Sequence, residues 1–232
     1  MRYSPQKRQP SAFTLTEVLL VIGMLALVAM LLFPVVGQMR AESRKVQCLG
    51  NLRQMGALFA LYAADHGASL PMARRDYTDA NGTPQVEVWF RRLFPYAGGS
   101  SRDADHKWLN CPARNASEPF NYTYAMERSA GSDTLDHTGA PVKLADLQQN
   151  LHLGVPVDGQ RWLLMDGVWY FIDHTKGLNA LSGAHYTPAF RHRKRLNVLL
   201  ANLSAQSVDA STMNSQLYIF RSQPIAPPIG PE

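Results

Sequence analysis

An apolar segment near the N-terminus constrains this chain more than any other feature. Residues 18–36 carry no charged side chain, and they follow a short segment, residues 1–12, with three cations and no acid. Nineteen residues of helix extend about 28 Å, close to the thickness of the hydrocarbon core of a bilayer. A secretory signal has a shorter apolar region of ~7–15 residues and a small-residue cleavage site, which residues 37–40 do not offer. The sequence therefore predicts a retained membrane helix.

Composition limits what the rest of the chain can be. The 232 residues are 46% apolar and 18% charged, which suits one domain with an appendage. Two cysteines exclude a disulfide-dense scaffold and a four-cysteine zinc site. The net charge is +5, but without residues 1–12 it falls to 20 cations against 18 acids, and only residues 191–195 form a basic cluster. Nucleic acid is therefore not an expected partner.

Residues 12–22, Ala-Phe-Thr-Leu-Thr-Glu-Val-Leu-Leu-Val-Ile, resemble the cleavage and methylation motif of type IV prepilins and type II secretion pseudopilins. The resemblance implies that prepilin peptidase removes a leader, residues 1–12, by cutting between Ala12 and Phe13. It also implies that the new amino group of Phe13 is methylated and that Glu17 is used in assembly. The family usually has Gly before the cut, where this chain has Ala12. Pro34 lies where many pilin helices kink, and a proline removes a helical hydrogen bond.

Periodicity predicts one long helix over residues 13–66. Its first half, residues 13–36, is apolar all round and suits a membrane or a filament core. Its second half, residues 37–66, is amphipathic, and Gly67 follows at the position where helices end. The apolar stripe of this second half consists of Val46, Leu49, Leu52, Met55, Phe59 and Tyr62.

The remaining residues predict a globular head over 67–222 and a disordered tail over 223–232, where four prolines occur in ten residues. Residues 68–86 and 98–105 have loop composition, and a short helix over 88–94 is expected to stop at Pro95. Asp166-Gly167 between two apolar runs predicts a two-residue hairpin. Strands are predicted over residues 122–126, 161–165, 168–172, 196–201 and 206–209. The fold class is α+β and pilin-like, a long N-terminal helix packed on an antiparallel sheet.

The head also resembles a large pilin-like family marked by a histidine, nine residues, then Asp-Gly. Cys48 followed by Asn51-Leu52-Arg53-Gln54, Cys111-Pro112 and His192 carry this resemblance. At the end of the motif this chain has Asn202-Leu203 instead of Asp-Gly. Asn tolerates the left-handed conformation that such a turn needs and Leu does not, so the turn is expected to be reshaped. The role of the family's Asp is therefore not carried over to Asn202.

The two cysteines leave two alternatives, one disulfide or two buried free thiols. A head outside the cytoplasm would lie in an oxidising compartment, which favours a Cys48–Cys111 disulfide. Closing a loop of about 63 residues would contribute roughly 4 kcal/mol in the chain-entropy model. Neither cysteine has the pattern of a catalytic nucleophile.

The sequence contains few signals for metal binding, catalysis or sugar binding. The seven histidines lack the spacing of a helical zinc site and are expected to be scattered over the surface, so no metal and no cofactor are predicted. No nucleophile elbow, phosphate loop or dinucleotide motif occurs, so no catalytic residue is predicted. The four tryptophans are expected in the core or in subunit contacts rather than in a sugar platform.

These features predict a non-enzymatic, pilin-like structural subunit of a type II secretion pseudopilus or a type IV pilus. The precursor would span the inner membrane once, with a periplasmic head, and would enter a filament after processing. Its expected partners are other pilin or pseudopilin subunits, prepilin peptidase, the inner-membrane assembly platform and, before assembly, membrane lipid. The alternative is a membrane-anchored periplasmic binding module or hydrolase that uses the helix only as an anchor.

Overall fold

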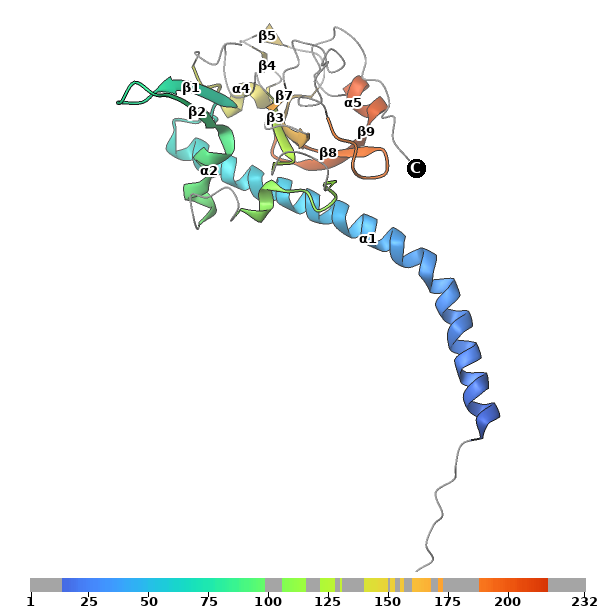
Figure 1. Ribbon diagram of the computed structural model, residues 1–232. Helices are drawn as coiled ribbons and strands as arrows, with labels where there is room; N and C mark the ends of the chain where they lie inside the picture. The colour runs from blue at the N-terminus through green and yellow to red at the C-terminus, as the bar shows by residue number, and fades with distance from the viewer. Residues whose placement is uncertain are drawn as a thin grey trace, which may run out of the picture. The chain divides into compact units, whose positions relative to one another are not determined.

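The computed structural model is of the α+β class, as predicted, and divides into two compact units, Met1–Ala41 and Glu42–Glu232. We call them the N-terminal unit and the head unit. Helix α1 (Leu15–Asp65) runs through both (Figure 1). The predicted leader, the cleavage site between Ala12 and Phe13 and the predicted tail lie outside the described residues. The structure describes residues 14–98, 106–115, 122–127, 130, 140–149, 151–152, 155–156, 160–167, 171–172 and 188–216.

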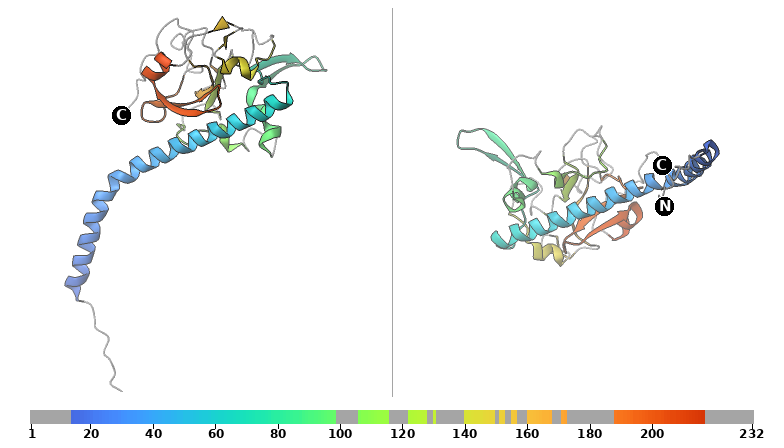
Figure 2. Two further views of the ribbon diagram at one scale, coloured as in Figure 1. Left: turned by 180° about the vertical axis from the view of Figure 1, so that it is seen from behind. Right: turned by 90° about the horizontal axis from the view of Figure 1, so that it is seen from below.

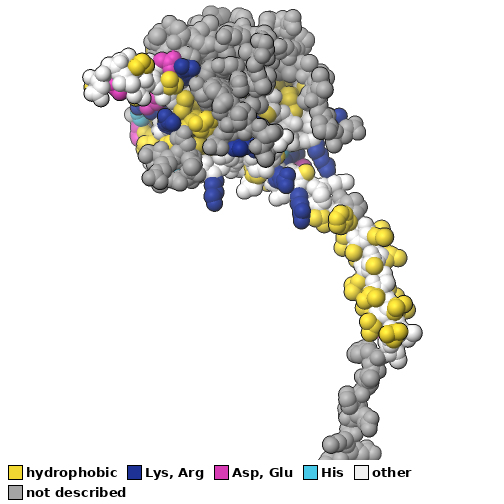
Figure 3. Space-filling view, in the orientation of Figure 1, with side chains coloured by type: hydrophobic (Ala, Val, Ile, Leu, Met, Phe, Trp, Pro, Cys, Tyr) yellow, Lys and Arg dark blue, Asp and Glu magenta, His cyan; other side chains and the backbone are white. Residues whose placement is uncertain are grey.

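Within the N-terminal unit, α1 carries no charged side chain over residues 18–36. The segment Leu15–Phe33 is long and apolar enough to cross a membrane, and none of it is buried. Its hydrophobic side chains cover this part of the helix (Figure 3). A segment of this kind is compatible with a single-pass anchor and also with a signal sequence. The helix continues through Pro34, and the kink expected at that residue remains a prediction.

The main sheet of the head unit has five strands in the order β7-β3-β6-β8-β9. All neighbours are antiparallel except β3 and β7, which are parallel. The five predicted strands are therefore confirmed, with ends shifted by a few residues. Their bounds are Tyr124–Glu127 for β3, Trp162–Asp166 for β6, Phe171–Ile172 for β7, Arg195–Leu200 for β8 and Ala205–Asp209 for β9.

The two-residue hairpin predicted at Asp166-Gly167 is wrong. Strand β6 pairs with β3 on one side and with β8 on the other, so β7 cannot lie beside it and pairs with β3 instead. All five residues of β6 are buried, as expected for a central strand. Asp166 is its last residue, and its carboxylate is buried inside the head rather than exposed at a turn.

The loop predicted over residues 68–86 contains a hairpin of β1 (Arg74–Thr78) and β2 (Pro84–Val88). The residues that suggested a loop form its turn, where the Asp79 carboxylate accepts the backbone N–H groups of Asn81 and Thr83. The expected stop at Pro95 is also wrong, because α2 (Trp89–Ala97) includes that residue. Its buried face holds the last turn despite the missing hydrogen bond. The remaining elements are η2 (Lys107–Leu109), α4 (Leu144–Gln148), β4 (Leu151–His152), β5 (Val155–Pro156) and α5 (Ala210–Gln216).

The core has two clusters, one on each face of the main sheet. Along β8, Leu196, Val198 and Leu200 belong to the cluster that includes Met213 of α5, whereas Leu199 belongs to the cluster with α1 and α2. This alternation follows from the period of two in a strand. Figure 2 shows the head part of α1 lying along the sheet. Its buried stripe is Cys48, Leu52, Met55, Phe59 and Tyr62, while Val46 is exposed, contrary to the predicted stripe.

Three of the four tryptophans lie in the core. Trp89 stacks on Phe59 with ring centroids 5.6 Å apart, and Trp89 and Trp162 are almost completely buried. Trp108 is also buried. The expectation of core tryptophans is confirmed for these three, and Trp169 lies outside the described residues.

Two glycines of α1 give a first prediction. A Cβ at Gly50 would have nothing within 4 Å, whereas a Cβ at Gly56 would lie 3.2 Å from Leu199 Cδ1 and 3.4 Å from the Leu203 carbonyl oxygen. Gly50→Ala is expected to raise the free energy of unfolding by about 0.5–1 kcal/mol, because glycine loses more backbone entropy in a helix. Gly56→Val is expected to lower it by about 1–3 kcal/mol through overpacking. Denaturant unfolding of the full chain in detergent measures both, and equal effects would contradict the close approach at Gly56.

Candidate functional site

Glu17 forms a capping box at the start of α1. Its Oε2 accepts hydrogen bonds from Thr14 N and Thr14 Oγ1, both at 2.8 Å, and Thr14 Oγ1 accepts from Glu17 N at 3.3 Å. This reciprocal arrangement satisfies free donors of the first helical turn. The signal for it, Thr-x-x-Glu over residues 14–17, is visible in the sequence. The carboxylate is fully exposed on the single chain.

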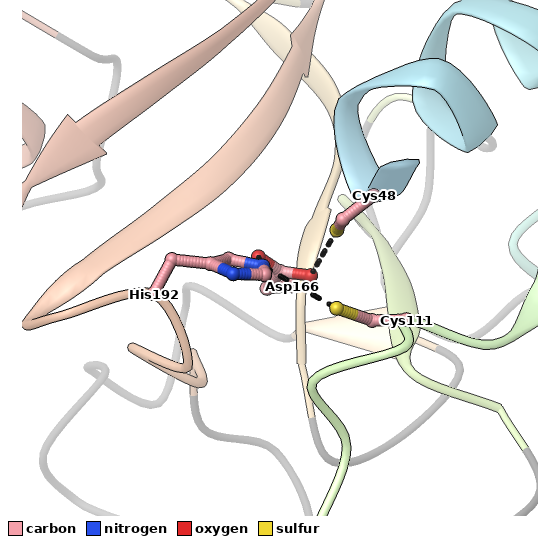
Figure 4. A group of neighbouring side chains, drawn as sticks. All are labelled: Cys48, Cys111, Asp166 and His192. Carbon is pink, nitrogen blue, oxygen red and sulfur yellow. Dashed lines mark hydrogen bonds and ion pairs between the residues drawn. The ribbon is translucent and has the colours of Figure 1, made fainter. Parts of the chain in front are cut away.

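A second group of residues lies buried in the head unit, where Cys48, Cys111, Asp166 and His192 converge (Figure 4). Cys48 comes from α1 and Cys111 from the loop after η2. Asp166 is at the end of β6, and His192 is in the turn that precedes β8. One donor atom from each lies within 4.8 Å of the others, and all four residues are buried. We call these four residues the buried cluster.

Three contacts define the buried cluster. Cys48 Sγ donates to Asp166 Oδ1 at 3.2 Å, and Asp166 Oδ2 lies 3.4 Å from His192 Nε2. The same Nε2 lies 3.3 Å from Cys111 Sγ. One ring nitrogen therefore faces both the thiol and the carboxylate. A nucleophilic triad needs the two ring nitrogens to serve the two partners separately, so the arrangement is not that of a Cys-His-Asp triad.

Neighbouring groups fix the members of the buried cluster. Tyr124 Oη donates to Cys48 Sγ at 3.1 Å, and the backbone N–H of Asn197 donates to Asp166 Oδ2 at 2.8 Å. The guanidinium of Arg191 lies beside the carboxylate, with Nη1 3.9 Å from Asp166 Oδ1. Its Nη2 donates to the Gly167 carbonyl at 2.8 Å, so Arg191 is held in place by the backbone that follows β6.

The buried cluster changes the acidity of its members. Burial raises the pKa of the Cys48 thiol, and hydrogen bonding to Cys111 adds to this. Burial by itself lowers the pKa of His192, but its interactions with Asp166 and Cys48 outweigh this and raise the pKa to about 9. The imidazole is therefore charged at neutral pH when only protein surrounds it, and it forms an ion pair with Asp166.

The structure places Asp166 and His192 beside the two cysteines that the sequence had paired. Both cysteines are free thiols in the same buried cluster, and the disulfide between them remains a prediction. The expectation of surface histidines is wrong for His192 and for His106, which is buried and stacks on Phe94. Asp166 was predicted in a hairpin turn with Gly167, and its place in the buried cluster was not predicted. No local spacing could reveal this site, because its successive members are 63, 55 and 26 residues apart in the sequence and meet only in the folded head.

The turn at Asn202-Leu203 differs from the expectation that Leu would avoid the left-handed region. Leu203 has a φ of 66°, and its N–H donates to the Leu200 carbonyl at 2.9 Å. Asn202 Oδ1 accepts from Ser204 N at 3.0 Å and from Ser204 Oγ at 2.7 Å. The Leu203 side chain packs on the core cluster that contains α1, and this burial offsets a backbone cost of about 1–2 kcal/mol.

A pocket of about 490 Å³ lies between α1 and the segment around η2. Asn51 crosses its floor, with Nδ2 donating to the Asn110 carbonyl at 3.1 Å and to Tyr124 Oη at 3.2 Å. Five of its seven lining residues are polar, while Trp108 and Pro112 add apolar surface, so it could accept a small ligand with polar groups. It is lined by Gln47, Asn51, Gln54, Lys107, Trp108, Asn110 and Pro112.

Comparison with known proteins found no match: no family model, no curated protein and no solved structure matches the chain. Its function therefore has to be argued from its own residues.

Proposed function

We propose that the chain is a non-enzymatic, pilin-like structural subunit of a type II secretion pseudopilus or a type IV pilus. One observation carries the proposal. The segment Leu15–Phe33 is a continuous helix whose large apolar side chains are exposed all round, and its start bears a single carboxylate, Glu17. An apolar surface of this extent is stable only in lipid or against other apolar helices. A filament core made of such helices supplies the second environment.

Under this proposal, the N-terminal unit is inserted into the membrane, cleaved and then transferred into a filament. The precursor spans the inner membrane once, with its head in the periplasm, and prepilin peptidase cuts it between Ala12 and Phe13. The assembly platform then moves the subunit from lipid into the filament. Its apolar surface is out of water both before and after this step, so the transfer has no large hydrophobic cost. The motif at residues 12–17 supports these steps, together with the exposed apolar helix.

N-terminal mass spectrometry of the mature protein, isolated from membranes of its own cells, tests the proposal. We expect a chain that begins at Phe13 and carries a methylated amino group. Deleting the prepilin peptidase should leave the precursor with Met1 intact. As a matched control, Ala12→Gly introduces the residue usual in the family and should be cut at the same bond. A mature start after Gly37, or an intact Met1 in cells with the peptidase, would contradict the proposal.

The pocket between α1 and η2 favours the alternative, an anchored periplasmic binding module or hydrolase. Deletion of the whole chain distinguishes the two functions. Loss of filaments or of secretion is expected for a structural subunit. Intact filaments, together with a small ligand that copurifies with the full chain and is lost in Gln54→Ala and Lys107→Ala variants, would support the binding module.

A further inference from the structure

We propose that Cys48, Cys111, Asp166 and His192 bind one Zn²⁺ ion in a closed, structural site. The inference does not depend on the proposed function, because it concerns only the head unit. Two sulfurs, one imidazole nitrogen and one carboxylate oxygen converge from four separate segments of the chain (Figure 4). Each of these atoms is a common zinc ligand, and four protein ligands without an open position are typical of structural sites.

The distances within the buried cluster match the edges of a zinc tetrahedron. With Zn–S near 2.3 Å and Zn–N or Zn–O near 2.0–2.2 Å, ligand atoms around one ion lie about 3.4–3.8 Å apart. The three contacts measure 3.2, 3.3 and 3.4 Å, close to these edges, with Cys48 facing Asp166 Oδ1 and His192 facing Asp166 Oδ2. One ligand atom from each residue lies within 4.8 Å of the others. Small side-chain shifts therefore suffice to place an ion at bonding distance from one ligand atom of each residue.

The shared nitrogen of His192 supports a metal over a purely protein network. Its Nε2 faces both Cys111 Sγ and Asp166 Oδ2, which is the arrangement expected when these atoms point at one central ion. A Cys48–Cys111 disulfide would use two of the four donors and leave Asp166 and His192 as a buried ion pair. The zinc site gives a role to all four.

Charge around the buried cluster is also suitable. Two thiolates and a carboxylate with Zn²⁺ sum to one negative charge, and the guanidinium of Arg191 lies 3.9 Å from Asp166 Oδ1. Tyr124 Oη donates to Cys48 Sγ and Asn197 N donates to Asp166 Oδ2, so two ligands already have outer partners. Such partners orient zinc ligands and strengthen binding. Binding releases the two thiol protons and the Nε2 proton of the His192 imidazolium to solvent.

The ligand set selects the metal. Calcium and magnesium prefer oxygen ligands only, so the two sulfurs exclude them. Zinc accepts sulfur, nitrogen and oxygen in a tetrahedron without changing oxidation state. An ion here would tie α1, the loop after η2, β6 and the turn before β8 together within the head unit. The site would therefore act as a crosslink of the head.

Metal analysis of the full chain tests the inference. The protein is purified in detergent without chelator or reductant and measured by mass spectrometry of the elements, where we expect about one zinc ion per chain. Cys111→Ser and His192→Ala should each lower the zinc content to about one tenth or less. His66→Ala removes an exposed imidazole outside the buried cluster and should retain full zinc content. Zinc content that is unchanged by the Cys111 and His192 substitutions would overturn the inference.

Measurements on the unaltered chain avoid dependence on variants that fail to fold. Cobalt added after removal of zinc should give the intense visible bands of a tetrahedral site together with thiolate-to-cobalt charge transfer. Both thiols should resist alkylation until EDTA is added. Resistance that only a reductant removes, with a mass lower by two hydrogen atoms, would show the disulfide and overturn the zinc site. Immediate alkylation and no uptake of added Zn²⁺ would also overturn it.

The outer partner Tyr124 gives a graded test. Tyr124→Phe keeps the ring in the core but loses the hydrogen bond to Cys48 Sγ, so zinc affinity should fall about tenfold or more. Competition with a chromophoric zinc chelator measures this change. An affinity equal to that of the unaltered chain would mean that the Cys48 sulfur is not a ligand.

Discussion

Replacing Arg161 with Met is expected to lower the free energy of unfolding of the head by about 3–5 kcal/mol. Arg161 Nη2 lies 2.6 Å from Glu127 Oε2, and each side chain is only 1% exposed. Glu127 ends β3 and Arg161 precedes β6, so the pair joins neighbouring strands of the central sheet. Removing the cation takes this ion pair from the buried Glu127 carboxylate, and the lost compensation of its charge causes most of the effect.

Removing both charges should lower the free energy of unfolding much less. The Glu127→Met/Arg161→Met double variant replaces the ion pair with apolar side chains, so its stability is expected within about 1–2 kcal/mol of the unaltered chain. Arg74 and Asp76, in contact at 2.8 Å with side chains 30% and 49% exposed, provide the control, since Asp76→Asn should change stability by about 0–1 kcal/mol. Denaturant unfolding of the full chain in detergent measures all of these variants. A double variant as unstable as Arg161→Met would contradict the explanation.

The sequence predicted those elements whose pattern is set by local residues. The helix found over Leu15–Asp65 agrees with the one predicted over residues 13–66, because an unbroken apolar run and an amphipathic stripe are visible without the fold. The five strands of the main sheet also lie within a few residues of their predicted positions. The parallel pairing of β7 with β3 was missed, because pairing depends on which strand edges remain free after the sheet has assembled.

The buried cluster could be predicted only in part. The predicted disulfide placed Cys48 and Cys111 together, but nothing in the sequence placed His192 beside them. Asp166 was missed because Asp-Gly is a strong local hairpin signal. The position of β6 between β3 and β8 overrides that signal and buries the carboxylate. The buried cluster therefore depends on the strand order of the sheet, which local sequence propensities do not predict.

Under the proposed function, Glu17→Ala is expected to reduce incorporation into filaments while leaving cleavage, membrane insertion and the head unit unchanged. After cleavage, the carboxylate of an incoming subunit can meet the amine of Phe13 on the subunit already docked. In the apolar surroundings of a filament core, an unpaired charge is strongly disfavoured. The reduction should be on the order of tenfold or more, since one unpaired charge shifts an equilibrium by at least that factor.

The capping box provides a way to separate this charge effect from a helix effect. Glu17 binds Thr14 through its Oε2, and Gln at this position of a capping box can make the same hydrogen bonds. Glu17→Gln therefore keeps the cap and loses the charge, whereas Thr14→Ala loses the Thr14 hydroxyl and keeps the charge. If the carboxylate acts by pairing with the Phe13 amine, Glu17→Gln must fail as Glu17→Ala does, and Thr14→Ala must incorporate normally. Quantitative immunoblotting of sheared filaments measures incorporation. If Glu17→Gln incorporated normally and Thr14→Ala did not, Glu17 would act through helix capping alone. Only the cap would then distinguish the variants that assemble from those that do not.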